Sequence, residues 1–322
     1  MKKVNIGGQA VLEGVMMKGP ESYALAVRTP EKEIDVQVTE YKSVGEKHKI
    51  ARIPIIRGVI NFIESLYIGI GTLMKSSEYY DEEEEEKTSD EKPKKEKREK
   101  TEKEKAVAEK AYMIGTLIMS LVIAIGIFML IPVFLANFMK HVTENQLIIN
   151  LTEGVLRLLL FLGYVALISL MKDIKRTFMY HGAEHKTINC LEAGDELTVE
   201  NVKKHTRFHK RCGTSFVFIV MFISIIVFMF VKTDVLWMKM VSRILLIPFI
   251  AGISYEFIRY AGRHENAFAN ILSKPGLWVQ RLTTREPDDD MIEVAIASVD
   301  AVIDWHEYVD CVRNDSFEKP EK

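Results

Sequence analysis

The sequence lacks the features that mark a secreted, disulfide-stabilised protein. It has only three cysteines, Cys190, Cys212 and Cys311, and no C-x-x-C pair among them. An odd number of cysteines without paired spacing argues against a disulfide framework and fits a reducing compartment. The first residues contain no apolar run long enough for a secretory signal, so we expect the N-terminus to stay in the cytoplasm.

Nucleotide-binding loops are also lacking. The glycine-rich opening with Gly7, Gly8 and Gly14 has neither a G-K-[ST] nor a G-x-G-x-x-G sequence. Those are the spacings with which a backbone loop holds phosphates. We therefore predict a tight turn here, with close approach of the backbone to another part of the chain.

Apolar residues gather in a few long runs instead of recurring at the spacing of a soluble core. Four runs approach the ~20 residues that a bilayer core requires. They are Ala111–Phe138, Leu147–Met171, Thr214–Val231 and Val235–Tyr255. The predicted fold class is mainly α: a polytopic membrane protein with about four transmembrane helices in segments 106–171 and 214–260, a small N-terminal β-hairpin region and cytoplasmic amphipathic helices.

Residues 53–80 form an ambiguous apolar segment. Its part Ile53–Lys75 is long enough to span, but it contains Arg57 and Glu64, whose charges are costly in lipid. An amphipathic helix on the membrane surface, or buried against the bundle, is favoured over a fifth span. The following segment 81–105 is a run of charges, which predicts a disordered linker or, at most, a solvated helix.

Lysine and arginine predict the orientation, because these residues are retained on the cytoplasmic side. Segment 172–213 has nine of them, whereas loop 139–146 has only Lys140. We therefore expect a multi-pass protein of the cell membrane, with both termini and segment 172–213 in the cytoplasm.

The N-terminal region 1–52 predicts a small folded piece. Two stretches of strand character, Tyr23–Arg28 and Glu33–Tyr41, are connected by Thr29-Pro30-Glu31-Lys32. This arrangement predicts a hairpin. A two-stranded hairpin is marginal alone, so we expect it to pack on another part of the cytoplasmic layer.

The C-terminal region 261–322 predicts a turn and a helix. Lys274-Pro275-Gly276 is typical of a turn. The acidic residues that follow Pro287 are typical of a helix start, because carboxylates complement the helix dipole. The apolar stripe from Met291 to Trp305 then predicts a packed cytoplasmic helix.

The most informative motif is His181-Gly182-Ala183-Glu184-His185, an H-x-x-E-H sequence. On a helix, its two histidines and its glutamate lie on one face. Inverted zinc metallopeptidases use this pattern, with the histidines on zinc and the glutamate activating a water. We predict a divalent metal site, with zinc as the ion, His181 and His185 as ligands and Glu184 as the catalytic base. The open alternative is a polar turn whose histidines bond backbone groups.

A catalytic zinc needs a third protein ligand and an open position. Glu256 is the first choice, because the expected topology brings the end of the fourth span to the same membrane face. The rivals are His209 and Cys212, which helical spacing could align. A site of three histidines and a cysteine would be closed and structural, so the third ligand distinguishes an enzyme from a structural metal site.

A basic cluster, defined as Lys203, Lys204, Arg207, Lys210 and Arg211, lies next to the predicted bilayer. The simplest interpretation is the positive-inside signal with contact to anionic lipids. A protein partner or ribosomal RNA is the alternative. Little aromatic interleaving is present, so no specific nucleic acid is expected.

Several long motifs, in the same order, resemble the YqhQ family of integral membrane proteins. They are GGQAVLEGVMM at Gly7–Met17, YHGAEHKTI at Tyr180–Ile188, HKRCGTSF at His209–Phe216, SYEFIRYAG at Ser254–Gly262 and QRLTTREPDDDMIEVAI at Gln280–Ile296. The resemblance covers most of the chain apart from 81–105. It implies a multi-pass membrane protein and a metal-dependent enzyme.

Two functions from different classes follow. The first is a membrane-embedded hydrolase that acts on a membrane-proximal peptide or a lipid-linked ester, with zinc as cofactor. The second is a non-enzymatic scaffold or regulator, for example of protein translocation or membrane-protein biogenesis, whose basic cluster binds a protein partner and whose His/Cys metal site is structural. A metal transporter is weaker, because the spans contain few ionisable residues beyond Glu153, Arg157 and Arg243.

Overall fold

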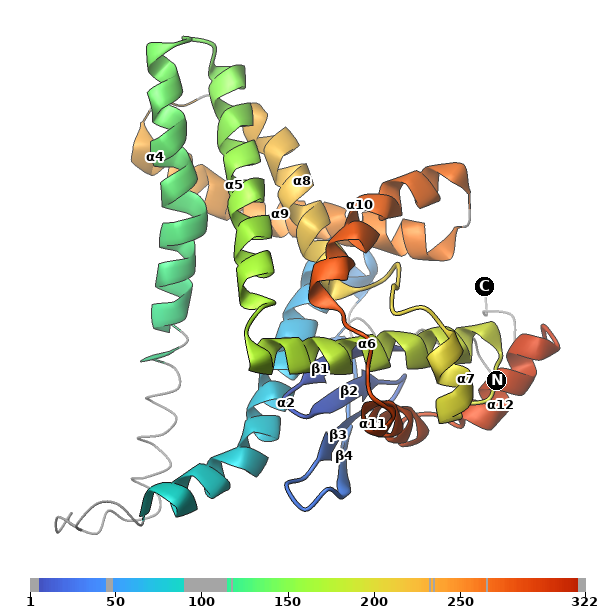
Figure 1. The fold of residues 1–322 in the computed structure, drawn as a ribbon. Helices are drawn as coiled ribbons and strands as arrows, with labels where there is room; N and C mark the ends of the chain where they lie inside the picture. The colour runs from blue at the N-terminus through green and yellow to red at the C-terminus, as the bar shows by residue number, and fades with distance from the viewer. Residues whose placement is uncertain are drawn as a thin grey trace.

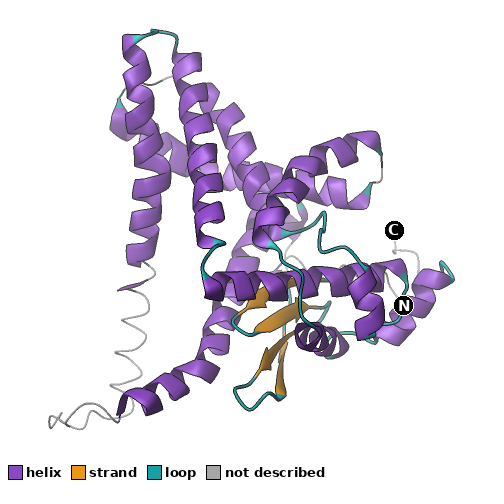
Figure 2. Cartoon of the chain, viewed as in Figure 1, coloured by secondary structure: helices purple, strands orange, loops and turns teal. Residues whose placement is uncertain are grey.

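The computed structural model describes residues 6–44, 49–89, 115–116, 118–231, 233, 235–264 and 266–317. Apolar helices rise from a layer in which helices cover a small antiparallel sheet (Figures 1 and 2). The chain is therefore mainly α, as predicted, with its strands confined to the N-terminal region.

The sheet is a four-stranded meander of β1 (Gly7–Val11), β2 (Gly14–Lys18), β3 (Ser22–Arg28) and β4 (Ile34–Glu40). The predicted hairpin is β3 and β4, paired from Ser22 opposite Glu40 to Arg28 opposite Ile34. The glycine-rich opening contributes β1 and β2, two strands that the sequence analysis did not predict. The expected tight turn is their connection, where Glu13 has a positive φ of 50°.

Each face of the sheet buries a separate set of apolar side chains. Val15, Met17 and Ala26 face α6 (Lys172–Ala193) and α11 (Asp289–Asp300). Met16 and Leu25, their neighbours along the same strands, face the other way, where Ile68 of α2 (Ile56–Ser89) joins them. Successive side chains of a strand point to opposite faces, so the sheet lies between two helical layers.

Helix α2 is long and apolar enough over Ile56–Tyr80 to cross a membrane. Its first half contacts α9 and its second half contacts the sheet region. Near its start the Asn61 amide donates a hydrogen bond to the hydroxyl of Tyr255 on α9 (Leu236–Arg263). Further along, Ser76 accepts a bond from the backbone N–H of Leu12, in the turn between β1 and β2. One side of α2 therefore packs on α9 and the sheet, while large apolar side chains such as Ile63 and Tyr67 stay exposed. The helix continues to Ser89, and the rest of segment 81–105 lies outside the described residues.

Four helices in the described part of the chain are long and apolar enough to span a membrane. They are Ile56–Tyr80, Ile118–His141, Gln146–Ile168 and Trp237–Gly262. The second includes a π-helical turn at Gly126–Leu130, α4 (Ile131–Asn137) and the 3-10 turn Phe138–His141. The third is α5, and its first backbone amides are capped by Asn145. Three of the four predicted spans therefore correspond to long apolar helices.

The third predicted span, Thr214–Val231, forms the shorter helix α8 (Gly213–Met229), with 17 residues. It packs on α5 at Gly154, where an added Cβ would lie 2.6 Å from a side-chain carbon of Ile225. Near the far end of α8, the Asn150 amide donates to the carbonyl of Phe228 at 3.1 Å. Helix α8 therefore runs alongside α5, from Cys212 at its N-terminus to the end of the bundle where α5 begins.

The remaining helices are the 3-10 turn Lys49–Arg52, α7 (Val199–Lys204), α10 (Ala267–Thr283) and α12 (Trp305–Arg313). Of these, α7 and α12 pack on α6, while α10 packs on α8 and α9 and the 3-10 turn packs on α2. The predicted helix after Pro287 is α11, which buries Met291, Val294 and Val299 as expected. The turn predicted at Lys274-Pro275-Gly276 is wrong, because these residues lie inside α10. There Gly276 lets α10 approach Ser215 of α8 closely.

Candidate metal centre

The H-x-x-E-H sequence is helical, as predicted, and lies in the middle of α6. Gly182 is a weak helix former, but a close contact explains its presence. The chain after α10 crosses α6 here, and the N–H of Arg285 donates to the carbonyl of Phe178 at 2.8 Å. A Cβ on Gly182 would come within 1.9 Å of the Arg285 carbonyl oxygen. Only glycine permits this crossing.

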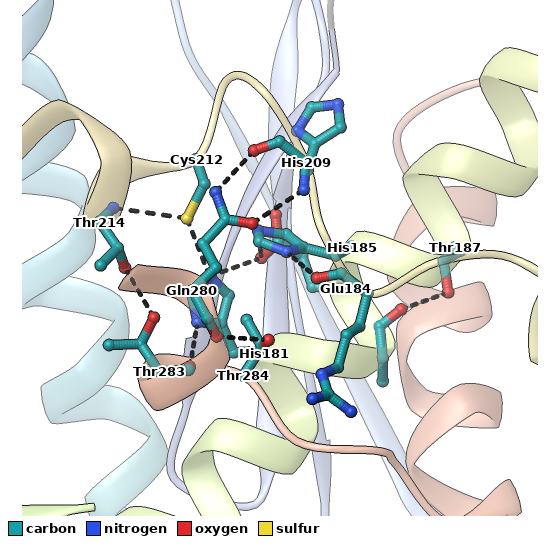
Figure 3. Close-up of polar contacts among 12 residues, drawn as sticks. His181, Glu184, His185, Thr187, His209, Cys212, Thr214, Gln280, Thr283 and Thr284 are labelled. Carbon is teal, nitrogen blue, oxygen red and sulfur yellow. Dashed lines mark hydrogen bonds and ion pairs between the residues drawn. The ribbon is translucent and has the colours of Figure 1, made fainter. Parts of the chain in front are cut away.

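The structure brings His181, His185 and Cys212 together. One ligand atom from each residue lies within 4.8 Å of the others, and no other group of this kind occurs among the described residues. The Nε2 atom of His181 is 3.3 Å from the sulfur of Cys212. Figure 3 shows the two imidazoles from α6 meeting the sulfur from the loop before α8. Two nitrogens and a sulfur are a ligand set typical of zinc.

Both imidazoles are held by their second nitrogen. The Nδ1 of His181 is 2.8 Å from the backbone carbonyl of Thr283. The Nδ1 of His185 is 2.7 Å from the backbone carbonyl of Arg207. A carbonyl can only accept, so each Nδ1 carries a proton and each Nε2 is directed toward the site, where it could bind a metal once deprotonated. Metal-binding histidines are commonly oriented in this way.

Cys212 reaches the site as the N-cap of α8, where its sulfur accepts a hydrogen bond from the backbone N–H of Thr214 at 3.4 Å. The preceding loop is fixed by Gln280 of α10, which is fully buried. The Gln280 side chain accepts a bond from the N–H of His209 and donates to its carbonyl, at 2.9 and 2.8 Å. The amide also donates to Ser215. Gln280 therefore fixes the position from which Cys212 enters the site.

Electrostatics favour a thiolate at this position. Burial alone would raise the pKa of Cys212, but the imidazoles of His181 and His185 outweigh burial and hold that pKa well below its usual value. Burial likewise opposes a charge on His181, but the Cys212 sulfur next to it outweighs this effect and raises the pKa of His181 to about 9. A thiolate is the form of cysteine that binds metals.

A zinc-class ion fits the geometry. For tetrahedral zinc, bonds of roughly 2.0 Å to nitrogen and 2.3 Å to sulfur separate the two ligand atoms by about 3.6 Å. The observed separation between His181 Nε2 and the Cys212 sulfur is 3.3 Å. For this pair, a movement of a few tenths of an ångström would accommodate the ion, and His185 offers its ligand atom within 4.8 Å of the other two.

Glu184 borders the site, as its place in the motif predicts. Its Oε2 is 3.7 Å from Nε2 of His181 and 3.8 Å from Nε2 of His185. Gly8 of β1 packs directly on this side chain, since an added Cβ would lie 2.8 Å from Cγ of Glu184. The expected close approach at the glycine-rich opening is therefore found, and its partner is the motif glutamate.

Glu256 does not join the three ligands. Its carboxylate forms a two-bond ion pair with Arg57 of α2, in which Arg57 Nε donates to Oε1 at 2.6 Å. Arg57 therefore occupies the carboxylate that was the first choice for the third ligand.

His209 lies near the site without contributing a ligand atom to the group. Its ring centre is 5.7 Å from that of His185, and its Nε2 is 3.5 Å from Glu192. His205 lies outside the ligand group, and its Nε2 contacts Asp195 at 2.9 Å. The predicted site of three histidines and one cysteine is therefore reduced to two histidines and Cys212.

Two supporting residues were missed by the sequence analysis, Gln280 and Thr283. Thr283 acts through its backbone carbonyl, which leaves no signal in the side-chain sequence. Gln280 lies in the segment that carries the family resemblance, which was the available signal.

Comparisons with known proteins identify relatives that match most of the chain. A family model described as a protein of unknown function, DUF1385, matches residues 53–305. The uncharacterized protein YqhQ of Bacillus subtilis (strain 168) is 36% identical over 307 residues, which are 92% of this chain and 92% of the relative. No solved structure gives a significant match. The chain therefore belongs to the DUF1385 family, as its resemblance to YqhQ-type membrane proteins predicted.

Proposed function

We propose that this chain is a metalloprotein of the cell membrane that binds a zinc-class divalent ion through His181, His185 and Cys212. The orientation of the two imidazoles carries the proposal. Each donates its Nδ1 proton to a backbone carbonyl, so the Nε2 atoms are left to share one site with the Cys212 sulfur. Histidines in a polar turn would not need this paired arrangement with a cysteine.

The reaction that we propose is hydrolysis of a membrane-proximal peptide or lipid-linked ester. A bound zinc-class ion would supply a Lewis acid and a water of lowered pKa. Glu184 stands beside both Nε2 atoms and would accept the proton of that water. His181 has the most exposed side chain of the three ligand residues, 16% compared with 1% for His185, so the substrate would enter on its side.

We place the site on the cytoplasmic side of the cell membrane. The support is the charge distribution, since segment 172–213 has nine Lys and Arg residues and loop 139–146 has one. In this orientation the basic cluster faces anionic lipid headgroups or a protein partner.

Metal content tests the first step. Purified wild type should hold one zinc per chain, and His185→Ala and Cys212→Ser should lose it. His205→Ala and Cys311→Ser are matched controls, because these side chains lie outside the ligand group, and both should retain the ion. Wild type with no bound metal, or equal loss in the controls, would overturn the proposal.

A structural metal site is the second candidate, and burial favours it. Glu184, His185 and Cys212 are only 4%, 1% and 5% exposed. An ion there would fasten the loop before α8 to α6 and stabilise a scaffold. Glu184→Gln separates the two functions, with Glu200→Gln as the exposed control. With fluorogenic peptides and acyl esters as probes, hydrolysis by wild type that Glu184→Gln abolishes while keeping its zinc supports the enzyme. Activity equal in the two proteins, or absent from both, leaves the structural site.

A further inference from the structure

A second cluster of charged side chains lies within the apolar helices, at the end of the bundle away from the metal centre. It consists of Glu153 and Arg157 on α5 and Lys239 and Arg243 on α9. All four are buried, with exposures of 1%, 9%, 7% and 2%. Charged residues in membrane helices are costly and usually serve a function.

The single carboxylate is shared by three cations. Arg157 Nη2 lies 2.7 Å from Glu153 Oε1, and Arg243 Nη2 lies 2.7 Å from Oε2, with a further bond from Arg243 Nη1. The ammonium of Lys239 is 2.9 Å from Oε2. Among the described residues, these three cations make no ion pair with any other carboxylate. The cluster therefore has two more positive charges than negative ones.

One of the cations has an unused donor, whereas Arg157 Nε donates to the carbonyl of Phe128 at 3.1 Å. The Nε of Arg243 is buried and has no hydrogen-bond partner among the described residues. The ring of Phe228 on α8 covers both guanidinium groups, with centroids 5.3 Å from Arg157 and 5.0 Å from Arg243. An ion-pair network that served only to join helices would be expected to balance its charge, because an uncompensated buried charge is strongly destabilising.

The cluster lies near the starts of both helices. Glu153 is seven residues from the start of α5 at Gln146, which is about 10 Å along a helix. Lys239 is three residues from the start of α9, or about 5 Å. Guanidinium groups match phosphate oxygens in shape and charge.

We infer that Arg157, Lys239 and Arg243 form a binding site for a phosphate-class anion, which neutralises the excess charge around Glu153. The anion comes from a phospholipid headgroup or from free phosphate, which share this chemistry. The site is independent of the metal centre, from which the length of α8 separates it.

Binding to delipidated protein distinguishes the two sources. One arm counts phosphatidylglycerol molecules retained per chain by native mass spectrometry, with phosphatidylcholine as the reference lipid. The other measures radiolabelled inorganic phosphate bound to protein in phosphatidylcholine nanodiscs. We expect Lys239→Gln to weaken anion binding by about tenfold or more, the loss typical of one charge-assisted hydrogen bond. Lys172→Gln, at the start of α6 beyond the opposite end of α5, should have no effect.

Glu153→Gln should change the anion affinity in the opposite direction. Removing the carboxylate raises the excess charge, so the variant should bind the anion more tightly than wild type if it keeps the gel-filtration profile of wild type. If this variant does not fold, Lys239→Gln alone decides, because Glu153 keeps both arginine partners there. The inference would be overturned if wild type bound neither phosphatidylglycerol nor inorganic phosphate. It would also be overturned if Lys239→Gln bound them as tightly as wild type.

Discussion

Gly182 lies directly beneath the carbonyl oxygen of Arg285, at the point where the chain leaving α10 crosses the motif helix. The same crossing segment begins with Thr283, whose carbonyl orients His181. The packing of one glycine and the direction of one imidazole therefore depend on the same stretch of backbone.

Gly182→Ala should destabilise the protein by roughly 1–3 kcal/mol, the usual cost of overpacking, despite the higher helix propensity of alanine. The added methyl group would displace the crossing segment and weaken zinc binding. Thermal unfolding and zinc titration measure the two effects. Gly163→Ala on α5 is the control, because its Cβ would meet nothing within 4 Å. Equal behaviour of the two variants would contradict the crossing.

Gln280→Leu should remove the support of the loop that delivers Cys212. The N–H and carbonyl of His209 would lose their buried partners, at a cost of about 1–3 kcal/mol for each. We expect a lower unfolding temperature together with weaker zinc binding. Lys274→Ala, at an exposed position of α10, should leave both measurements unchanged. Full zinc affinity in Gln280→Leu would show that Cys212 needs no support from α10.

Glu256→Ala should keep its zinc, because its carboxylate pairs with Arg57 and not with the ligand group. Its effect should be a loss of stability of up to about 1 kcal/mol, as for other partly exposed ion pairs. The exchanged pair Arg57→Glu with Glu256→Arg should recover part of that stability. The opposite outcome would be loss of zinc from Glu256→Ala while Arg57→Gln retains it. That result would identify Glu256 as a ligand.

Glu192 should make the free energy of unfolding depend on pH in the acidic range. Burial would raise its pKa, but the hydrogen bond from His209 and the charge of Arg211 lower it to about 2. A depressed pKa adds stability above the unfolded value near 4.5, and this stability is lost as pH falls from there toward 2. Partial exposure limits the effect to about 1–2 kcal/mol. The stability gap between wild type and Glu192→Gln should therefore shrink from pH 7 to pH 3, with Glu200→Gln as control. A constant gap would contradict the assignment.

The local parts of the site were predictable from sequence. The spacing of His181, Glu184 and His185 fixes their common face once α6 is helical, and the hairpin of β3 and β4 follows from its alternation and turn. Cys212 was left open beside His209 and Glu256, because the choice depends on the path of the loop before α8. That path is determined by Gln280, far along the chain.

Other elements escaped prediction for similar physical reasons. Strands β1 and β2 are rich in glycine and form only because β3 and the helices cover them. Pro275 and Gly276 have turn character, but packing of α10 on α8 at Ser215 keeps them helical. In both places contacts between distant segments override local preference.

The carbonyl that orients His181 belongs to Thr283, 71 residues beyond Cys212 in the chain. During synthesis the ribosome therefore makes all three ligand residues well before the group that directs the first of them. All the apolar helices, and α10 after them, must leave the ribosome before the imidazole can be locked in place. Under the proposed function, metal loading in the cell should accordingly be a late event of biogenesis, completed after α10 has left the ribosome.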